Sequence, residues 1–128
     1  MYPKEFRYTR EHEWMALEGN RARVGITHYA QDHLGDVVFV ELPGIGRALR
    51  KGESFGVVES VKTVSDIYAP IGGRVVEVNE ALTTSPELIN QDPHGRGWML
   101  VVEVENPAEA ADLLNSEAYE EYLKEAGH

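Results

Sequence analysis

The chain has 128 residues, of which 42% are hydrophobic and 27% are charged, and these proportions fit one compact domain with an apolar core. Twelve Lys and Arg stand against 22 Asp and Glu, and the formal net charge of -10 argues against nucleic acid and anionic membranes as partners. The chain has no cysteine, which excludes disulfides, thiolate metal sites and a cysteine nucleophile. Any thiol chemistry would have to come from a bound or attached cofactor.

The first residues, "MYPKEFRYTR", contain no apolar segment typical of a secretory signal. No run of about 18 apolar residues indicates a membrane span. We therefore expect a cytoplasmic protein. The absence of a transit segment favours a bacterial chain over a mature organellar one.

The first predicted elements are a hairpin and a short helix. Residues 12–26, "HEWMALEGNRARVGI", alternate polar and apolar side chains around turn residues at 18–20, which predicts a β-hairpin. Residues 27–35 change to a helical period, with Thr27 as the N-cap and Gly35 at the C-terminal end.

Strand patterns occupy the middle of the chain. After a strand at 36–42, residues 47–60 predict a strand, a turn at Lys51 and Gly52, and a second strand. Residues 65–80 repeat this pattern, with a turn at 70–73. The sequence therefore predicts two similar hairpins.

Lys62, one of only four lysines, lies between these two hairpins. If one strand ends at Ser60 and the next begins near Val64, residues 61–63 form the loop between them. We expect Lys62 to project outward from this loop.

The C-terminal third changes from strand to helix. Ser85, followed by proline, predicts the N-terminus of a short helix that ends before Pro93, and residues 97–106 predict the last strand. Residues 107–126 show helical spacing, with a second helix beginning at Ser116. Short strands without helical crossovers predict a mostly β fold, an antiparallel sandwich or small barrel with a helical tail.

No set of residues predicts a self-sufficient active site. His28 and His33 are the only close histidine pair, and their i,i+5 spacing does not put two ligands on one helix face. No serine lies in a GxSxG motif, and the glycine pairs lack the lysine of a P-loop. With 22 acids, chance pairs of carboxylates are abundant. We expect no catalytic residue and no metal site.

Lys62 is better suited to modification than to catalysis. An exposed amine stays protonated and is a poor Schiff-base nucleophile. A lysine held at a fixed, accessible place suits an attaching enzyme, and a group tethered there has a high effective concentration at a docked active site. From spacing alone, an ordinary exposed turn lysine remains the alternative.

Several segments together resemble the H protein family of the glycine cleavage system, a family of lipoyl carriers. They are "HEW", "VGIT", "AQDHLGDVVFVELP", "ESVKTVSDIYAPIGGRVVEVN", "LIN" and "GWM", in the order of the family and across nearly the whole chain. The resemblance implies a lipoyl-domain-like flattened barrel or sandwich of two antiparallel sheets, a barrel-sandwich hybrid, with short helices and a C-terminal helical tail. Residues 1–128 would form a single lipoyl-carrier domain, with a lipoyl-like core at about 20–105 and C-terminal helices at about 107–126.

The resemblance also implies a function and its partners. Lys62 would carry lipoic acid as an amide, and the arm would take an aminomethyl group from glycine decarboxylase (P protein) to the tetrahydrofolate-dependent aminomethyltransferase (T protein). The dihydrolipoyl electrons would then pass to dihydrolipoamide dehydrogenase (L protein). A lipoate-attaching enzyme would be the fourth partner. The protein would be a carrier without catalytic residues, and we expect a monomer when it is free.

Further residues take roles from the same resemblance. Glu11, Glu13 and Asp66 would line a cleft that shelters the aminomethyl arm, because a cationic amine seeks a carboxylate. Glu11 stands where the family is expected to have a small hydroxyl residue. Glu59 and Ser60 would be recognised during lipoylation. For each acid the alternative is an ordinary solvated side chain.

Three other interpretations compete with this one. A biotin carrier shares the hairpin lysine, but Val61 and Thr63 stand where methionines would favour biotin. A lipoyl-relay protein, which donates lipoate to other carriers, differs only in its partners. An enzyme is the weakest interpretation, since no base, nucleophile or metal cluster supports it.

Overall fold

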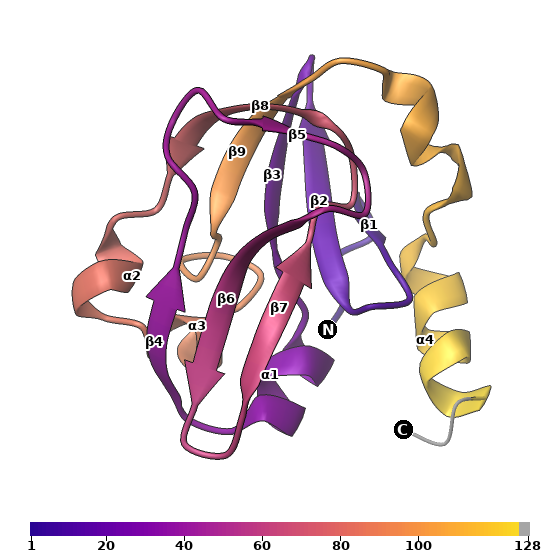
Figure 1. The fold of residues 1–128 in the computed structure, drawn as a ribbon. Coiled ribbons are helices and arrows are strands. Elements are labelled where there is room, and N and C mark those ends of the chain that lie inside the picture. Colours follow the sequence, from indigo (N-terminus) through magenta and orange to yellow (C-terminus); the bar gives the residue numbers. More distant parts are fainter. Residues whose placement is uncertain (126–128) are drawn as a thin grey trace.

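The computed structural model describes residues 1–125 and contains two antiparallel β-sheets that pack against each other without closing into a barrel (Figure 1). The larger sheet has the strand order β1-β2-β3-β9-β8-β5, and the smaller has the order β4-β6-β7. The strands are β1 (Phe6–Tyr8), β2 (Glu13–Glu18), β3 (Arg21–Ile26), β4 (Val37–Glu41), β5 (Ala48–Leu49), β6 (Ser54–Ser60), β7 (Val64–Tyr68), β8 (Gly73–Val78) and β9 (Leu100–Val104). The predicted mostly β sandwich of two antiparallel sheets is therefore confirmed.

Five helical segments connect or follow the strands. They are α1 (His28–Leu34), α2 (Ala81–Thr84), α3 (Leu88–Gln91), the 3-10 helix η1 (Pro107–Asp112) and α4 (Ser116–Glu125). Within residues 1–125, none of them has the length and apolar character needed to cross a bilayer.

The main core lies between the sheets and is filled by aliphatic side chains from both. Its fully or nearly fully buried members include Met15, Val24 and Val102 from the large sheet and Val40, Val58 and Ile67 from the small sheet. Burial of this apolar surface is the main favourable contribution to folding.

The predicted N-terminal hairpin forms as β2 and β3. Trp14 lies opposite Gly25, and a Cβ atom at Gly25 would lie only 2.8 Å from the Trp14 indole. The indole therefore occupies the space that any side chain at Gly25 would need. Its Nε1 donates to Pro93 O at 2.9 Å, which satisfies the buried polar atom of a fully buried ring.

The prediction of two hairpins, one on either side of Lys62, is wrong. β5 pairs with β8, whereas β6 pairs with β4 and β7, so the turn at Lys51 and Gly52 carries the chain from the large sheet to the small one. The turn at 70–73 carries it back, from β7 to β8. Polar and apolar alternation indicates which face of a strand is buried, but not which strand lies beside it.

The helix ends agree in part with the sequence. Thr27 caps α1, since its Oγ1 accepts from Ala30 N, and Gly35 N donates to Gln31 O at the other end. Ser85, in contrast, does not begin a helix: its N–H donates to Ala81 O and closes α2, a helix that was not predicted.

The C-terminal tail consists of two helices, as predicted, with a short extended link. Leu114 exchanges two backbone hydrogen bonds of 2.8 Å with Tyr8, so the link joins the edge of β1. The second helix begins at Ser116, and Asn115 caps it by accepting from Ala118 N. The predicted end at residue 126 lies outside the described residues.

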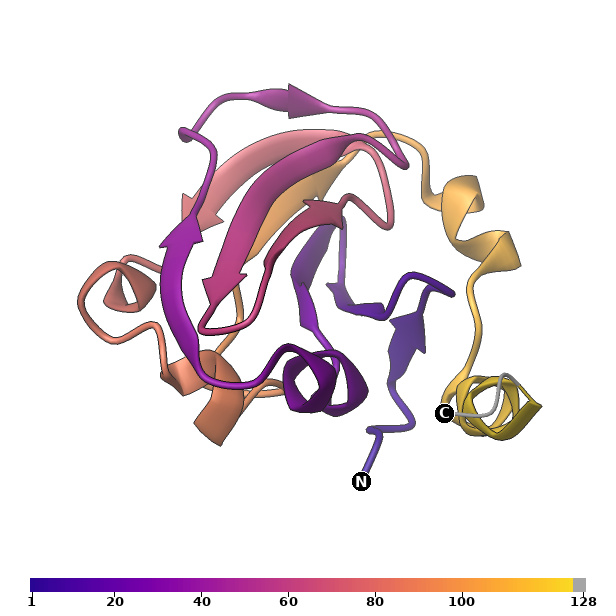
Figure 2. The ribbon, with the colours of Figure 1, turned by 60° about the horizontal axis from the view of Figure 1, so that its bottom comes forward.

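An aromatic cluster fastens α4 to β1 and β2. Figure 2 shows α4 on the same side of the molecule as β1. Tyr8, Trp14 and Tyr119 are fully buried, and the Tyr8 and Tyr119 rings are stacked with 4.8 Å between their centroids. His94 lies beside Phe6 and Trp14, and its Nε2 accepts from His28 N at 3.1 Å. Because its Nε2 accepts, the imidazole must be neutral, with its one proton on Nδ1.

His94 makes the fold sensitive to acid. Burial lowers the pKa of His94 to about 4, so the unfolded state, with a pKa near 6.5, binds more protons between these values. The stability contributed by the neutral ring is complete above pH 6.5 and is lost as the pH falls through 4. Between pH 7 and pH 4.5, the variant His94→Gln should lose about 2 kcal/mol less unfolding free energy than the unsubstituted protein. Urea denaturation at the two pH values measures this difference.

The comparison of the two proteins cancels the titration of the other groups, Glu13 included. Equal losses of unfolding free energy in the two proteins would contradict this prediction.

Candidate functional site

Lys62 lies in the three-residue loop between β6 and β7, as predicted. Ser60 N donates to Thr63 O at 2.8 Å, and Ser60 Oγ accepts from both Lys62 N and Thr63 N at 3.2 Å. Val61 N donates to Asp36 O at 3.0 Å, which joins the loop to the segment that follows α1. The loop backbone is thus fixed while the Lys62 side chain is exposed.

Gly35 gives the Lys62 side chain its place beside α1. Gly35 has a φ of +79°, which favours glycine, and a Cβ atom there would lie 3.0 Å from Lys62 Cε. The aliphatic part of Lys62 therefore crosses Gly35 at the C-terminal end of α1. The lysine side chain therefore extends from the hairpin tip along the end of this helix.

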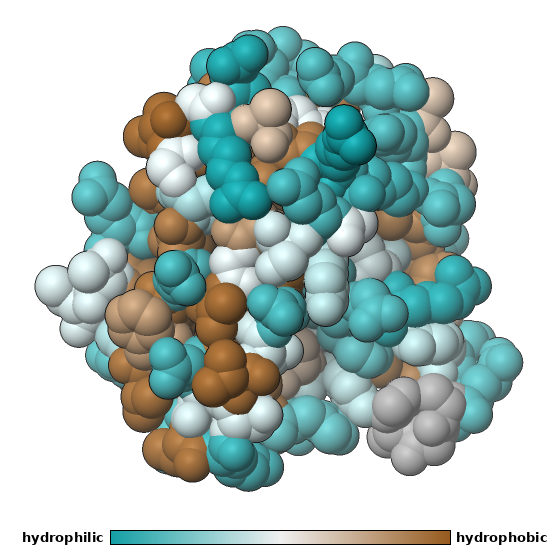
Figure 3. Space-filling model, viewed as in Figure 1, coloured by the Kyte–Doolittle hydropathy of each residue, from teal (hydrophilic) through white to brown (hydrophobic). Residues whose placement is uncertain are grey.

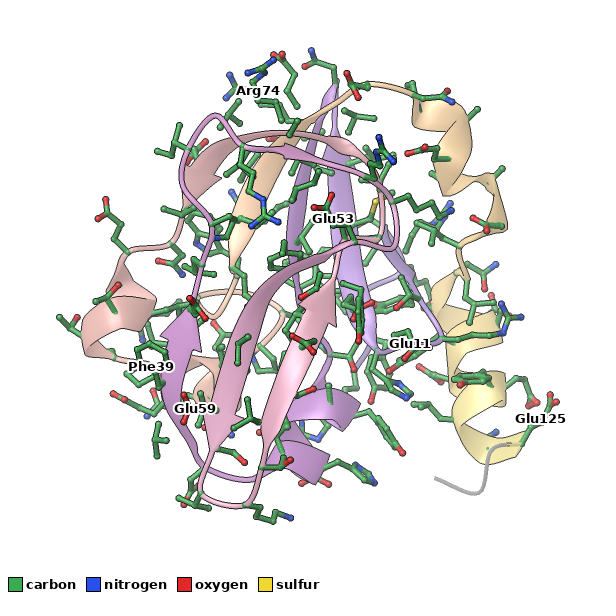
Figure 4. All side chains as sticks on the ribbon, viewed as in Figure 1. Glu11, Phe39, Glu53, Glu59, Arg74 and Glu125 are labelled. Carbon is green, nitrogen blue, oxygen red and sulfur yellow. The ribbon has the colours of Figure 1, made fainter. Side chains whose placement is uncertain are left out.

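An apolar patch surrounds the lysine, with Val61 68% exposed, Val64 63%, Val38 54% and Phe39 51%. Figure 3 shows apolar residues over β4 and the hairpin tip, at the lower left. Phe39 and Val64 are the register partners of Glu59 on its two sides, and Figure 4 shows Phe39 and Glu59 at this side of the small sheet. Exposed apolar patches rimmed by polar groups typically mark surfaces that another protein covers.

A cavity of about 270 Å³ lies between α1 and β7, and we refer to it as the α1–β7 cavity. It is lined by Glu11, His12, Ile26, Tyr29, Ala30, His33, Leu34, Ser65, Asp66 and Ile67. The structure therefore brings together two of the predicted cleft acids, Glu11 and Asp66, both of which are exposed. An apolar lining with carboxylates suits a flexible apolar chain that ends in a cation.

Glu13, the third predicted cleft acid, is buried and only 2% exposed. Its carboxyl accepts from Thr9 Oγ1 at 2.6 Å and from Tyr68 N at 3.2 Å. Burial raises the pKa of Glu13 to about 7, although these two hydrogen bonds lower it. Glu13 lines a second cavity of about 190 Å³, which it shares with Glu11. Glu11, on the side of β7 facing α4 in Figure 4, is therefore common to both cavities.

Sequence reasoning missed the contribution of α4 to this region. The hydroxyl of Tyr119 lies 2.8 Å from His12 Nδ1 and 2.8 Å from Thr27 Oγ1. The helical spacing of residues 107–126 predicted a helix here, but no role for any of its side chains. These contacts join residues 92 or more positions apart, and no local pattern indicates them.

The residues present fit a covalently attached group better than a bound metal. Among residues 1–125, no three histidine or acidic side chains come together in an arrangement that could hold a metal ion. The Lys62 side chain is exposed and lies against Gly35, and the α1–β7 cavity begins at the preceding residue, Leu34.

Comparison with known proteins indicates the family. Residues 6–126 match the family model described as glycine cleavage H-protein. The chain is 61% identical to the glycine cleavage system H protein of Symbiobacterium thermophilum over 96% of both chains. It is 55% identical to that of Bacillus subtilis, over 96% of this chain and 97% of the relative.

The crystal structure of a glycine cleavage system H protein from Mycobacterium marinum has the same fold. The TM-score is 0.86 at 42% identity, over 98% of this chain and 99% of that chain. Since the family model, the relatives and the solved structure agree over nearly the full length, the chain belongs to the glycine cleavage H-protein family.

Proposed function

We propose that this protein carries lipoic acid as an amide on Lys62 Nζ. The family consists of lipoyl-carrying components of the glycine cleavage system that are not themselves catalytic enzymes. The observation that carries the assignment to Lys62 is its position at the centre of a hairpin loop whose backbone is fixed by Ser60 and Asp36. Once attached, lipoate supplies the pair of thiol sulfur atoms that a chain without cysteine cannot provide.

The arm on Lys62 serves several enzymes in turn. It takes an aminomethyl group from the P protein to the T protein, and then gives its electrons to the L protein. Each of these enzymes, and the lipoate-attaching enzyme, must cover the surface around Lys62. The exposed apolar side chains of Val61, Val64 and Phe39 offer that contact.

The α1–β7 cavity shelters the loaded arm in this proposal. Lys62 crosses Gly35 at the end of α1, and the preceding residues His33 and Leu34 line the cavity, so an arm that folds back along α1 reaches it. Glu11 and Asp66 then accept hydrogen bonds from the amine of the cargo. Glu13, in the adjacent cavity, adds a third carboxyl group close to the same place.

The lipoyl-relay role is the second candidate function. A relay transfers only lipoate, which carries no cation, and has no use for carboxylates around the arm. The two acids that line the α1–β7 cavity therefore favour transport of an amine. We also propose that the protein acts in the cytoplasm of a bacterium, as a monomer when free.

Lys62→Arg should abolish lipoylation and leave the fold intact, because Lys62 is exposed and supports no buried contact. Intact mass and peptide mapping after incubation with lipoate, ATP and a lipoate-attaching enzyme should show one lipoyl group on Lys62 in the unsubstituted protein and none in the variant. Lys4→Arg, at another exposed lysine, is the matched control and should still be modified. A lipoyl group on Lys4, Lys51 or Lys124 instead would refute the assignment.

Ser60→Ala should slow lipoylation without unfolding the protein. It removes the hydroxyl that accepts from Lys62 N and Thr63 N, so the loop becomes more mobile. We expect the kcat/KM of the attaching enzyme to fall about tenfold, which corresponds to about 1.4 kcal/mol for the two lost hydrogen bonds together.

Ser65→Ala, in the adjacent strand, serves as the control and should be modified at the normal rate. If both serine variants behaved like the unsubstituted protein, the Ser60 hydroxyl would have no part in presenting Lys62.

Glu13→Gln should leave lipoylation intact and shorten the lifetime of the aminomethyl-loaded form, measured by loss of the amine after isolation. Glu80→Gln, at an exposed acid outside both cavities, is the matched control and should keep the normal lifetime. A normal lifetime in Glu13→Gln would remove Glu13 from the sheltering role.

The same variant has an effect on stability that does not depend on the cargo. The folded state holds the proton of Glu13 up to about pH 7, whereas the unfolded state releases it near pH 4.5. The corresponding stability is complete below pH 4.5 and is lost as the pH rises through 7. Glu13→Gln should therefore lose about 2 kcal/mol less unfolding free energy than the unsubstituted protein between pH 5 and pH 8.

A further inference from the structure

The hydroxyl group of Tyr119 connects the C-terminal helix to the α1–β7 cavity. Tyr119 is fully buried, and its hydroxyl oxygen lies 2.8 Å from Thr27 Oγ1 and 2.8 Å from His12 Nδ1. Neither of these partners belongs to α4. One oxygen atom of the tail thus bonds to two segments of the N-terminal half.

Thr27, the first partner, determines where α1 begins. Its Oγ1 accepts from Ala30 N at 3.2 Å, and its carbonyl oxygen accepts from Gln31 N at 3.1 Å. Thr27 is fully buried, so its hydroxyl depends on protein partners for its hydrogen bonds. Through Thr27, Tyr119 contacts the start of the helix that forms one wall of the cavity.

His12, the second partner, lies in the segment before β2, which forms another wall of the cavity. Its φ of +72° is uncommon for a residue other than glycine, and it places Glu11 and Glu13 on either side of a sharp bend. Its ring lines the cavity, and its centroid lies 4.4 Å from that of Tyr29 on α1. His12 O also accepts from Thr27 N at 3.0 Å, so the two walls already meet at this point.

The packing of α4 fixes the position of the hydroxyl. The Tyr119 ring is stacked on Tyr8 and lies edge-on to Tyr2, with centroids 4.8 and 5.2 Å away. Burial raises the pKa of Tyr119, so the hydroxyl keeps its proton. It can donate to His12 and accept from Thr27, or the reverse, and both bonds are made in either arrangement.

We propose that Tyr119 is a positioning residue for the arm cleft: its hydroxyl holds Thr27 and His12 together and thereby sets the spacing of the two walls between which the loaded arm lies. This inference rests on the proposed function for its effect on the arm. The effect of Tyr119 on α1 and on the bend at His12 does not depend on the proposed function. The C-terminal helix contributes to shelter of the cargo, although it does not itself line the cavity.

The test compares two variants that each lose one hydroxyl from the same aromatic stack. Tyr119→Phe keeps the ring and loses both hydrogen bonds. Tyr8→Phe is the matched control, because the Tyr8 hydroxyl donates to Pro3 O, at 2.8 Å, and Tyr8 is not among the residues that line the α1–β7 cavity.

Amide hydrogen exchange of the complete, unlipoylated proteins gives the first measurement. In Tyr119→Phe, the amides of Ala30 and Gln31 should exchange about tenfold faster, the effect of one lost hydrogen bond. In Tyr8→Phe their rates should stay within about twofold of the unsubstituted protein. Equal rates in the two variants, whether fast or slow, would overturn the inference.

The second measurement uses the lipoylated proteins. Both variants should be lipoylated at the normal rate, since the hairpin loop is unchanged, but only Tyr119→Phe should lose its aminomethyl cargo several times faster. A normal lifetime in Tyr119→Phe would overturn its role in sheltering the arm. Failure to lipoylate the unsubstituted protein would instead overturn the proposed function, and the exchange measurement would still decide whether Tyr119 positions α1 and His12.

Discussion

The contact between the carboxyl of Glu13 and the edge of β7 holds the two sheets at a defined spacing. β7 is an edge strand, and Tyr68 N on its outer side donates to Glu13 in β2 of the large sheet. The desolvation of a carboxyl is unfavourable, as the raised pKa of Glu13 shows. Thr9 and Tyr68 offset part of this cost. Glu13 lines one of the two cavities and the neighbouring residue Glu11 lines both, so this contact lies where the two cavities meet.

Apart from the helix start at Ser85, the parts of the fold that local sequence determines were predicted well, and those that depend on distant partners were not. The loop around Lys62 and the cap at Thr27 arise from residues within four positions of one another. The turns at Lys51 and at 70–73 also exist, but they connect different sheets. The period of a strand defines its buried face, whereas its neighbour depends on how the whole chain packs.

The residues of the candidate site, likewise, were predicted in part and missed in part. A resemblance in sequence pointed to Glu11 and Asp66, which line one cavity. It could not show that Glu13 is buried, because the sequence around Glu13 resembles an ordinary exposed strand start. The hydroxyl of Tyr119 was also missed, since Thr27 lies 92 positions away and a tyrosine on the apolar face of a helix is usually explained by its ring.

The apolar side chains beside Lys62 affect how the molecules behave in solution. Val61 and Val64 are each more than 60% exposed. The β6–β7 hairpin tips of two molecules would therefore attract each other through their apolar surfaces. The formal net charge of -10 opposes this contact between identical molecules, and Glu59 and Asp66 place part of the charge on the same small sheet. Salt screens repulsion between exposed charges but leaves apolar attraction in place. The negative charge of the chain therefore opposes self-association through this apolar surface. This opposition weakens as the ionic strength rises.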